Sequence, residues 1–203
     1  MVASGFSFEE ASTRVDESLD GMTAGCNPAH RIAPIAMFAP LDDSALDVAA
    51  VAEARLTHRH PLSGEVAAVV ARLCRALIRG SPWSTALGMA ADGRSPETRR
   101  AVEAPHSGEL SRGGFAPEVL RSAVHFLDIS DSLSAALARS IHFAGPANYC
   151  PVLVGSIGGA RWGHSRIEEG IFRHHGDLVS RLTKVAFVLG AGWRTSDTSS
   201  HDA

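Results

Sequence analysis

The stretch from Pro61 to Pro82, PLSGEVAAVVARLCRALIRGSP, decides the fold class of this chain. Its large apolar residues recur every three or four positions, a spacing that places side chains on one face of an α-helix. The stripe consists of Val66, Val69, Val70, Leu73 and Leu77. Its arginines lie largely off this stripe, and Gly80-Ser81-Pro82 disfavours further helix. The stretch therefore predicts an amphipathic helix over residues 61–78.

The same spacing recurs along most of the chain. Helices are predicted over residues 44–56, 117–127, 132–143, 150–162 and 177–189. Asp42 and Asp43 suit the N-cap and first turn of the first of these. Gly155 and Gly159 are expected to mark close backbone packing, because glycine otherwise weakens a helix. Alternating runs long enough for a strand are lacking in the sequence, so the predicted fold is all-α.

The chain is predicted to form one all-α domain over residues 21–194. An N-terminal extension over residues 1–20 precedes it, and a polar tail over residues 195–203 follows. The stretch 91–114 is polar, contains two prolines and a Gly-Gly pair, and has few apolar side chains. It is predicted to be a mobile loop.

Composition excludes several classes of protein. The chain has 203 residues, a formal net charge of −3 and a pI near 6.3, which argues against nucleic-acid binding. The apolar runs are too short to span a membrane, and the first residues do not resemble a secretion signal. We therefore expect a cytoplasmic protein. Its three cysteines, Cys26, Cys74 and Cys150, are expected to be free thiols.

The residues alone do not predict a metal site. Neither the His58/His60 pair nor the adjacent His174 and His175 has the spaced carboxylates or thiols that zinc sites use. Acidic residues occur only in small groups, whereas Mg²⁺ needs clustered carboxylates. One such group flanks the turn after residue 127, where Asp128 is expected to act as a turn or capping residue.

Four segments, in order, resemble the ADP-ribosylglycohydrolase family. They cover residues 25–35 (GCNPAHRIAPI), 56–61 (LTHRHP), 115–126 and 141–163. The first resembles the family's Gly- and Asn-containing loop, which runs into an Arg-led apolar helix. The second resembles its Thr-His segment, and the last two resemble the family's last metal-binding motif with the helices around it.

The resemblance implies an all-α helical bundle that binds two Mg²⁺ ions through carboxylates. It also implies hydrolysis of the glycosidic bond that joins ADP-ribose to a protein side chain or a related acceptor. The family's last metal motif reads Gly-Gly-Asp-x-Asp-[Thr/Ser], but here Ala147 and Tyr149 occupy the two carboxylate positions. The family's N-terminal Gly-Asp and Thr-Asp-Asp-Thr motifs do not occur in this sequence. We therefore expect a bundle truncated on its N-terminal side and predict no metal cofactor.

The ligand-facing segments match the family better. By resemblance, Gly25, Asn27 and His58 lie near bound ADP-ribose, although Cys26 stands where the family has its asparagine. His58 is expected either to line the pocket or to cap a helix C-terminus. Arg31 is expected either to hold a phosphate or to anchor the loop. Asn148 would supply one neutral oxygen, too little for a two-metal site.

Three hypotheses follow from these matches and departures. The first is a divergent or impaired hydrolase of the family. The second is a non-catalytic relative that binds ADP-ribose, an ADP-ribosylated protein or another nucleotide. The third is one part of a split protein, or a chain that self-associates, because the sequence lacks the family's N-terminal half.

Overall fold

The computed structural model describes residues 5–145, 149–167 and 169–193. Over these residues the chain is helical, and its only bridge of β type is an isolated one between Gly25 and Phe115. The elements are α1 (Phe8–Ser18), α2 (Asn27–His30), α3 (Ala33–Met37), α4 (Asp43–Arg55), α5 (Pro61–Ile78), α6 (Trp83–Ala91), α7 (Pro96–Glu103), α8 (Ala116–Asp128), α9 (Leu133–Ala144), α10 (Tyr149–Trp162), the 3-10 turn η2 (His164–Arg166) and α11 (Glu169–Leu189). The all-α prediction is confirmed.

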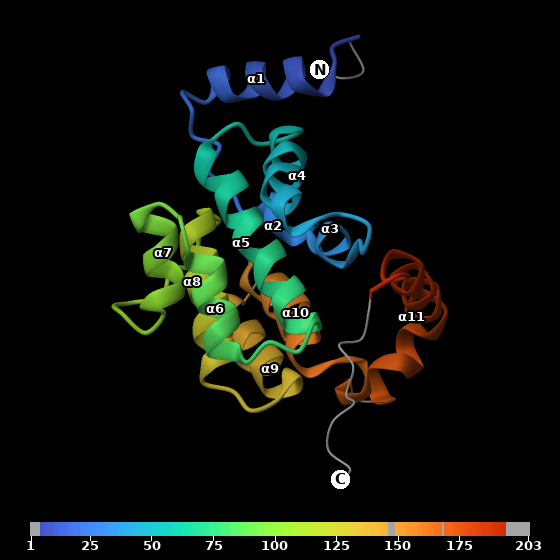
Figure 1. The fold of residues 1–203 in the computed structure, drawn as a ribbon. Coiled ribbons are helices and arrows are strands. Elements are labelled where there is room, and N and C mark those ends of the chain that lie inside the picture. Colours follow the sequence, from blue (N-terminus) through green and yellow to red (C-terminus); the bar gives the residue numbers. More distant parts are fainter. Residues whose placement is uncertain (1–4, 146–148, 168, 194–203) are drawn as a thin grey trace.

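Helix α5 is the centre of the molecule, and the other core helices surround it (Figure 1). It begins and ends where its spacing predicts, at Pro61 and Ile78. The predicted stripe is buried, and alanines fill most of the positions between. Burial of each valine or leucine side chain contributes about 1.5–3 kcal/mol, so the stripe of α5 is a large favourable contribution to folding.

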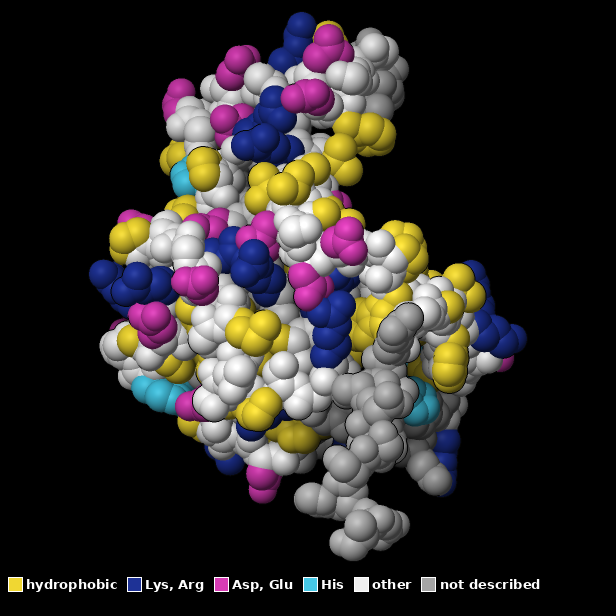
Figure 2. Space-filling model, viewed as in Figure 1, with side chains coloured by type: hydrophobic (Ala, Val, Ile, Leu, Met, Phe, Trp, Pro, Cys, Tyr) yellow, Lys and Arg dark blue, Asp and Glu magenta, His cyan; other side chains and the backbone are white. Residues whose placement is uncertain are grey.

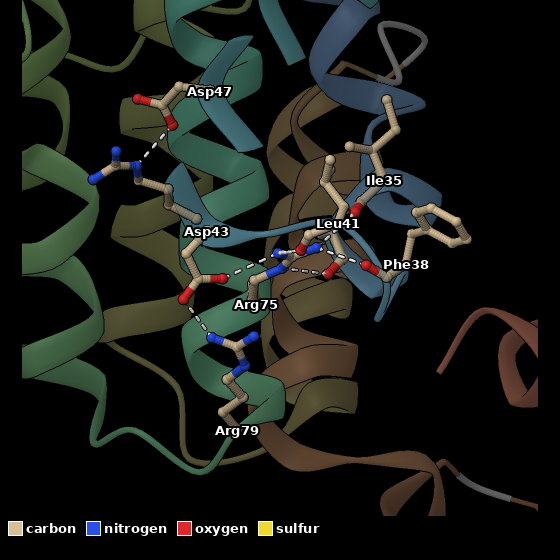
Figure 3. Close-up of polar contacts among 9 residues, drawn as sticks. Ile35, Phe38, Leu41, Asp43, Asp47, Arg75 and Arg79 are labelled. Carbon is tan, nitrogen blue, oxygen red and sulfur yellow. Dashed lines mark hydrogen bonds and ion pairs between the residues drawn. The ribbon is translucent and has the colours of Figure 1, made fainter. Parts of the chain in front are cut away.

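Arg75 is the one charged side chain of α5 that is buried. Figure 3 shows its guanidinium enclosed by the turn between α3 and α4. It donates to the backbone carbonyls of Ala36, Leu41, Ile35 and Phe38 at 3.0, 2.6, 3.2 and 2.9 Å. Its Nη1 also lies 3.0 Å from Asp43 Oδ1. Arg75 therefore holds the turn between α3 and α4, whose own backbone hydrogen bonds include that from Leu41 N to Phe38 O at 3.2 Å.

Two expected capping roles differ in the structure. Asp42 occupies the N-cap position of α4, but its side chain makes no capping hydrogen bond, and Asp43 instead pairs with the arginines of α5. Asp128, at the end of α8, accepts hydrogen bonds from Trp83 Nε1 at 3.0 Å and from His106 Nε2 at 2.7 Å. Both carboxylates thus join separate elements, which sequence position alone does not reveal.

The stretch 91–114, expected to be a loop, contains helix α7. Ser95 caps this helix through a hydrogen bond from Thr98 N to Ser95 Oγ. Ser95 and Thr98 also donate to the Glu65 carboxylate on α5. The loop prediction is therefore wrong for residues 96–103, because a serine cap and a link to α5 stabilise a helix that has little apolar surface.

Close packing on α10 occurs at Gly158 rather than at the two glycines expected. A Cβ atom on Gly158 would lie 2.8 Å from Leu133 Cδ1, 3.1 Å from Trp162 Cζ3 and 3.2 Å from Leu127 Cδ2. The same atom on Gly159 would meet nothing within 4 Å, and on Gly155 it would be 3.9 Å from Leu137. The predicted position of close packing is therefore wrong by one residue, because Gly158 and not Gly159 faces the neighbouring side chains.

Two helices lie at the periphery, α1 beyond α4 and α11 beside α3 (Figure 1). Helix α1 falls in the expected extension, where Ser7 and Glu10 form a capping box. Helix α11 begins eight residues earlier than predicted and has one residue with non-helical backbone angles, His175. The expected tail over residues 195–203 lies outside the described residues. None of the described helices is both long and apolar enough to cross a membrane.

Candidate functional site

A cavity of about 710 Å³ lies where four segments of the chain meet. The residues that line it are Asp20, Gly21, Met22, Ala24, Gly25, Cys26, Asn27, His60, Gly114, Phe115 and Tyr149. The isolated bridge joins two of these segments: Cys26 N donates to Gly114 O at 3.1 Å, and Ala116 N donates to Ala24 O at 2.9 Å. The start of α10 adds Tyr149. Two of the five predicted ligand residues, Gly25 and Asn27, therefore line one cavity.

His58 lies directly behind this cavity wall. A Cβ atom on Gly25 would be only 2.9 Å from His58 Nε2, so the histidine ring packs against the Gly25 backbone. The ring's Nδ1 lies 2.9 Å from Thr57 Oγ1. Burial, together with the charge of Arg31, lowers the pKa of His58, which favours the neutral ring. In this arrangement His58 supports the ligand loop from behind.

Arg31 anchors α2 to α4. Its Nε lies 2.5 Å from Glu53 Oε1, and its Nη2 donates to Thr57 Oγ1 at 2.7 Å. The guanidinium is committed to these partners, and Arg31 is not among the cavity-lining residues. Of the two roles expected for Arg31, the geometry agrees with the anchoring one.

Tyr149 stands at one of the two positions where the family resemblance expects a carboxylate. Its ring centroid is 6.3 Å from that of His30, with 28° between the ring planes. On its other side, a Cβ atom on Gly114 would lie 3.4 Å from Tyr149 Cζ. An aromatic ring therefore occupies this corner of the cavity. Ala147 and Asn148 lie outside the described residues.

The thiols near this corner are buried and protonated. Burial raises the pKa of Cys26 to about 11, and its Sγ lies 3.3 Å from His30 Nε2. Burial, with a smaller contribution from Cys26, raises the pKa of Cys150 to about 12. Burial likewise lowers the pKa of His30, which favours its neutral form. These groups are uncharged near neutral pH, so neither cysteine has the character of a nucleophilic thiolate. All three cysteines are free.

The side chains of the cavity do not fit a pair of Mg²⁺ ions. Mg²⁺ requires oxygen ligands and is usually bound through carboxylates. Asp20 is the single carboxylate on the described part of the cavity wall. Over the residues that the structure describes, no three His, Cys, Asp or Glu side chains are grouped so that they could hold a metal. Chemistry that depends on two metals therefore has no support from these residues.

The aromatic and apolar part of the cavity wall was not predicted from the sequence. Phe115 and Met22 line the cavity and are 43% and 76% exposed. One feature of the sequence could have pointed to Phe115, because this residue stands between a Gly-Gly pair and the start of a predicted helix. No feature of the sequence pointed to Met22, since its position depends on the fold of the segment between α1 and α2.

Comparisons with known proteins agree on one family. A sequence model described as ADP-ribosylglycohydrolase matches residues 2–195. Over 154 residues the chain is 27% identical to the ADP-ribosyl-[dinitrogen reductase] glycohydrolase of Rhodospirillum rubrum. That match covers 72% of this chain and 49% of the relative, so the chain spans about half the relative's length.

A solved structure shares the fold. It is titled an ADP-ribosylglycohydrolase-related protein complex and superposes with a TM-score of 0.74 at 24% sequence identity. The superposition covers 86% of this chain and 62% of the solved one. At this identity the likeness concerns the fold alone.

Proposed function

Because the chain belongs to the ADP-ribosylglycohydrolase family, we propose that it recognises ADP-ribosyl groups carried by proteins or related acceptors. The observation that carries this proposal is the cavity at Gly25 and Asn27. The loop that resembles the family's ligand loop forms one wall of a 710 Å³ cavity, a volume typical of small-molecule sites. Gly25 packs closely against the ring of His58, which does not itself line the cavity.

Recognition is favoured over metal-dependent hydrolysis by the groups at the cavity. Tyr149 fills a corner where a carboxylate was expected, and the neighbouring thiols are neutral. Neutral oxygens and sulfurs do not replace the charge that holds Mg²⁺. The side chains at the cavity therefore support binding of the ADP-ribosyl group without a metal.

Hydrolysis of the ADP-ribosyl linkage is the second candidate, favoured by the similarity to a protein named as a glycohydrolase. Cleavage of a glycosidic bond needs groups that protonate the leaving atom and activate water. Asp20 and His60 are the cavity residues suited to that work. His60 Nδ1 accepts a hydrogen bond from Leu62 N at 3.2 Å. In the neutral ring, Nε2 therefore carries the proton that could be exchanged with a substrate.

One experiment separates the two candidates. The purified chain is incubated with ADP-ribosylated arginine and serine peptides, with Mg²⁺ or with EDTA, and free ADP-ribose is quantified. Calorimetry with ADP-ribose is run in parallel. Binding that EDTA does not change, without release, supports recognition alone. Release that is lost in both Asp20→Asn and His60→Ala supports hydrolysis. Neither binding nor release at millimolar ligand would contradict the proposed function.

A further inference from the structure

Two histidines and an aspartate form a chain of hydrogen bonds where the segment between α7 and α8 meets α8. His106 Nε2 lies 2.7 Å from Asp128 Oδ2, and His106 Nδ1 lies 2.9 Å from His125 Nδ1. His106 belongs to the segment, whereas His125 and Asp128 lie one turn apart at the end of α8. These three residues, the histidine clasp, therefore hold the segment through imidazole groups, which titrate near neutral pH.

The contact between the two imidazoles contains a single hydrogen atom. At 2.9 Å, one Nδ1 must donate and the other must accept. His106 Nε2 faces an ionised carboxylate, which only accepts, so this nitrogen carries a hydrogen of its own. The pair keeps these contacts when it is neutral and when it carries one positive charge. When both rings are protonated, each Nδ1 carries a hydrogen and the two donors oppose each other, so the contact is lost.

Charged groups around the clasp oppose a second positive charge. The guanidinium of Arg121 on α8 acts on His125, and that of Arg161 on α10 acts on Asp128. Burial, followed by the charge of His106, lowers the pKa of His125. Asp128 is the carboxylate that offsets these positive charges, and its hydrogen bond from His106 lowers its own pKa. One imidazolium is therefore balanced at this site, whereas two are not.

The other elements at the clasp contribute a neutral ring and a separate ion pair. Helix α6 provides Trp83, whose Nε1 donates to Asp128 Oδ1 at 3.0 Å. At the end of α7, Glu103 pairs with Arg99 on its own helix at 3.3 Å. The proton balance of the clasp therefore depends on Asp128 and the two imidazoles.

The clasp differs from the ion pairs of the core helices. Glu53, Asp43 and Asp47 each pair with an arginine, and the face in Figure 2 shows acidic and basic side chains lying side by side. Arginine keeps its charge throughout the physiological range, so those pairs do not respond to mild acid. Asp128 instead pairs with His106, whose other nitrogen contacts a second histidine. The clasp therefore responds in a pH range where the arginine pairs are constant.

We propose that the histidine clasp is an acid-sensitive switch, which holds the start of the α7–α8 segment against α8 while its two imidazoles share at most one positive charge. Protonation of both imidazoles releases residues 104–106. Arg121 limits the release, because it donates to the carbonyls of Ser107 and Glu109 at 2.5 Å each. Phe115, at the far end of the segment, therefore remains in the cavity wall.

The clasp should take up its two protons in separate steps. The first charge is stabilised by Asp128, whereas the second breaks the Nδ1 contact and is repelled by the first. The second step should therefore lie at least about one pH unit below the first and below about pH 6.5, the ordinary value for histidine. The released state binds the second proton more readily, so the closed clasp is favoured above about pH 6.5 and is lost as pH falls through the second step. NMR shifts of the imidazole nitrogens of His106 and His125, in the full chain, measure both steps.

Backbone amide exchange measures the release itself. Ala104 N donates to Arg100 O at 3.0 Å, and Ser107 N donates to Ala104 O at 3.1 Å. After correction for the intrinsic rate, exchange of these two amides should be about three- to tenfold faster at about pH 5 than at about pH 7.5. Ala116 N, bonded to Ala24 O at 2.9 Å beside the isolated bridge, is the internal reference and should keep its protection.

His125→Asn tests the clasp directly. The side-chain amide of asparagine reaches the position of a histidine Nδ1 and donates to His106 Nδ1, but it gains no charge in acid. Exchange at the acid end should therefore stay slow in this variant. His142→Asn is the matched control, because His142 is exposed on α9, and it should accelerate in acid as the parent protein does. Asp128→Asn removes the balancing charge and should move the first protonation step to lower pH.

The measurements on the parent protein decide the proposal even if a variant fails to fold. Equal protection of Ala104 and Ser107 at both ends of the pH range would overturn it, and so would uptake of both protons in a single step. Equal acceleration in His125→Asn and in the parent would also overturn it. None of these measurements uses a ligand, so their outcome is independent of the proposed function.

Discussion

Arg75 is a buried arginine that links α5 to the segment between α3 and α4. Its five hydrogen bonds reach four backbone carbonyls and the Asp43 carboxylate, and its side chain is only 3% exposed. Lysine carries three donors on one nitrogen and cannot reproduce the planar fork. Arg75→Lys should therefore leave buried carbonyls without partners and lower the free energy of unfolding by about 2–4 kcal/mol, measured by urea unfolding.

Arg79→Lys is the control for this prediction. Arg79 lies one helical turn later on α5, is 45% exposed, and has an ion pair to the same Asp43 carboxylate at 2.5 Å. Exposed pairs are worth about 0–1 kcal/mol, so this variant should unfold almost like the parent protein. Equal destabilisation by the two substitutions would contradict the role given to burial of Arg75.

Substitution of Gly25 tests whether His58 supports the ligand loop. A methyl group in Gly25→Ala would approach His58 Nε2 to 2.9 Å, so the ring or the loop must move. We expect a changed NMR shift of the His58 imidazole and several-fold weaker binding of ADP-ribose. Gly88→Ala, on α6 with nothing within 4 Å of the added carbon, should change neither. An unaltered His58 signal in Gly25→Ala would argue against the contact.

At the scale of single helices, adjacent glycines on α10 make a matched pair. Alanine is favoured over glycine inside a helix by about 1 kcal/mol, and this gain applies to both positions. At Gly159 the added carbon meets nothing within 4 Å, so Gly159→Ala should raise the free energy of unfolding by about 0.5–1 kcal/mol. At Gly158 it would meet three side chains within 3.2 Å. Gly158→Ala should therefore be less stable than Gly159→Ala by at least about 1 kcal/mol, measured by thermal and urea unfolding.

The helices that the sequence predicts well are those with a buried apolar face. For α5, α8, α9 and α10, the spacing of apolar residues predicts the ends within one residue. Helix α7 was missed because its stability depends on Ser95 and on the distant Glu65, and such a contact leaves no periodic signal. The choice between Gly158 and Gly159 also requires the neighbouring helices, since a glycine pattern alone does not tell which face is covered.

For the whole molecule, the cavity depends on pairings between distant segments. The bridge joins residues 24–26 to residues 114–116, and His60 and Tyr149 come from two further regions. Family resemblance predicted the first segment as a ligand loop, and Gly25 and Asn27 do line the cavity. Spacing along the chain could not place Phe115 opposite that loop, because nothing local specifies an isolated bridge between elements about ninety residues apart.

The three carboxylates that link α4, α5 and the start of α7 each have a lowered pKa. Burial alone would raise the pKa of Asp43, Asp47 and Glu65, but hydrogen bonds outweigh it. The donors are Arg79 and Arg75 for Asp43, Arg94 and Arg72 for Asp47, and Ser95 and Thr98 for Glu65. Together they connect α4, α5 and the start of α7, so their protonation affects contacts throughout the domain.

The pH dependence of stability follows from these directions. A carboxyl whose pKa is lower in the folded state stabilises the fold above its unfolded value, about 3.9–4.3, and this stabilisation is lost as pH falls through the folded pKa. The melting temperature should therefore change little between about pH 7 and 5 on account of these groups and fall steeply below about pH 4. A variant combining Asp43→Asn, Asp47→Asn and Glu65→Gln should melt lower than the parent at neutral pH, because the charged partners are lost, yet decline less between about pH 5 and 3. Calorimetry across this range measures both slopes. Parallel curves for parent and variant would show that other groups govern acid unfolding.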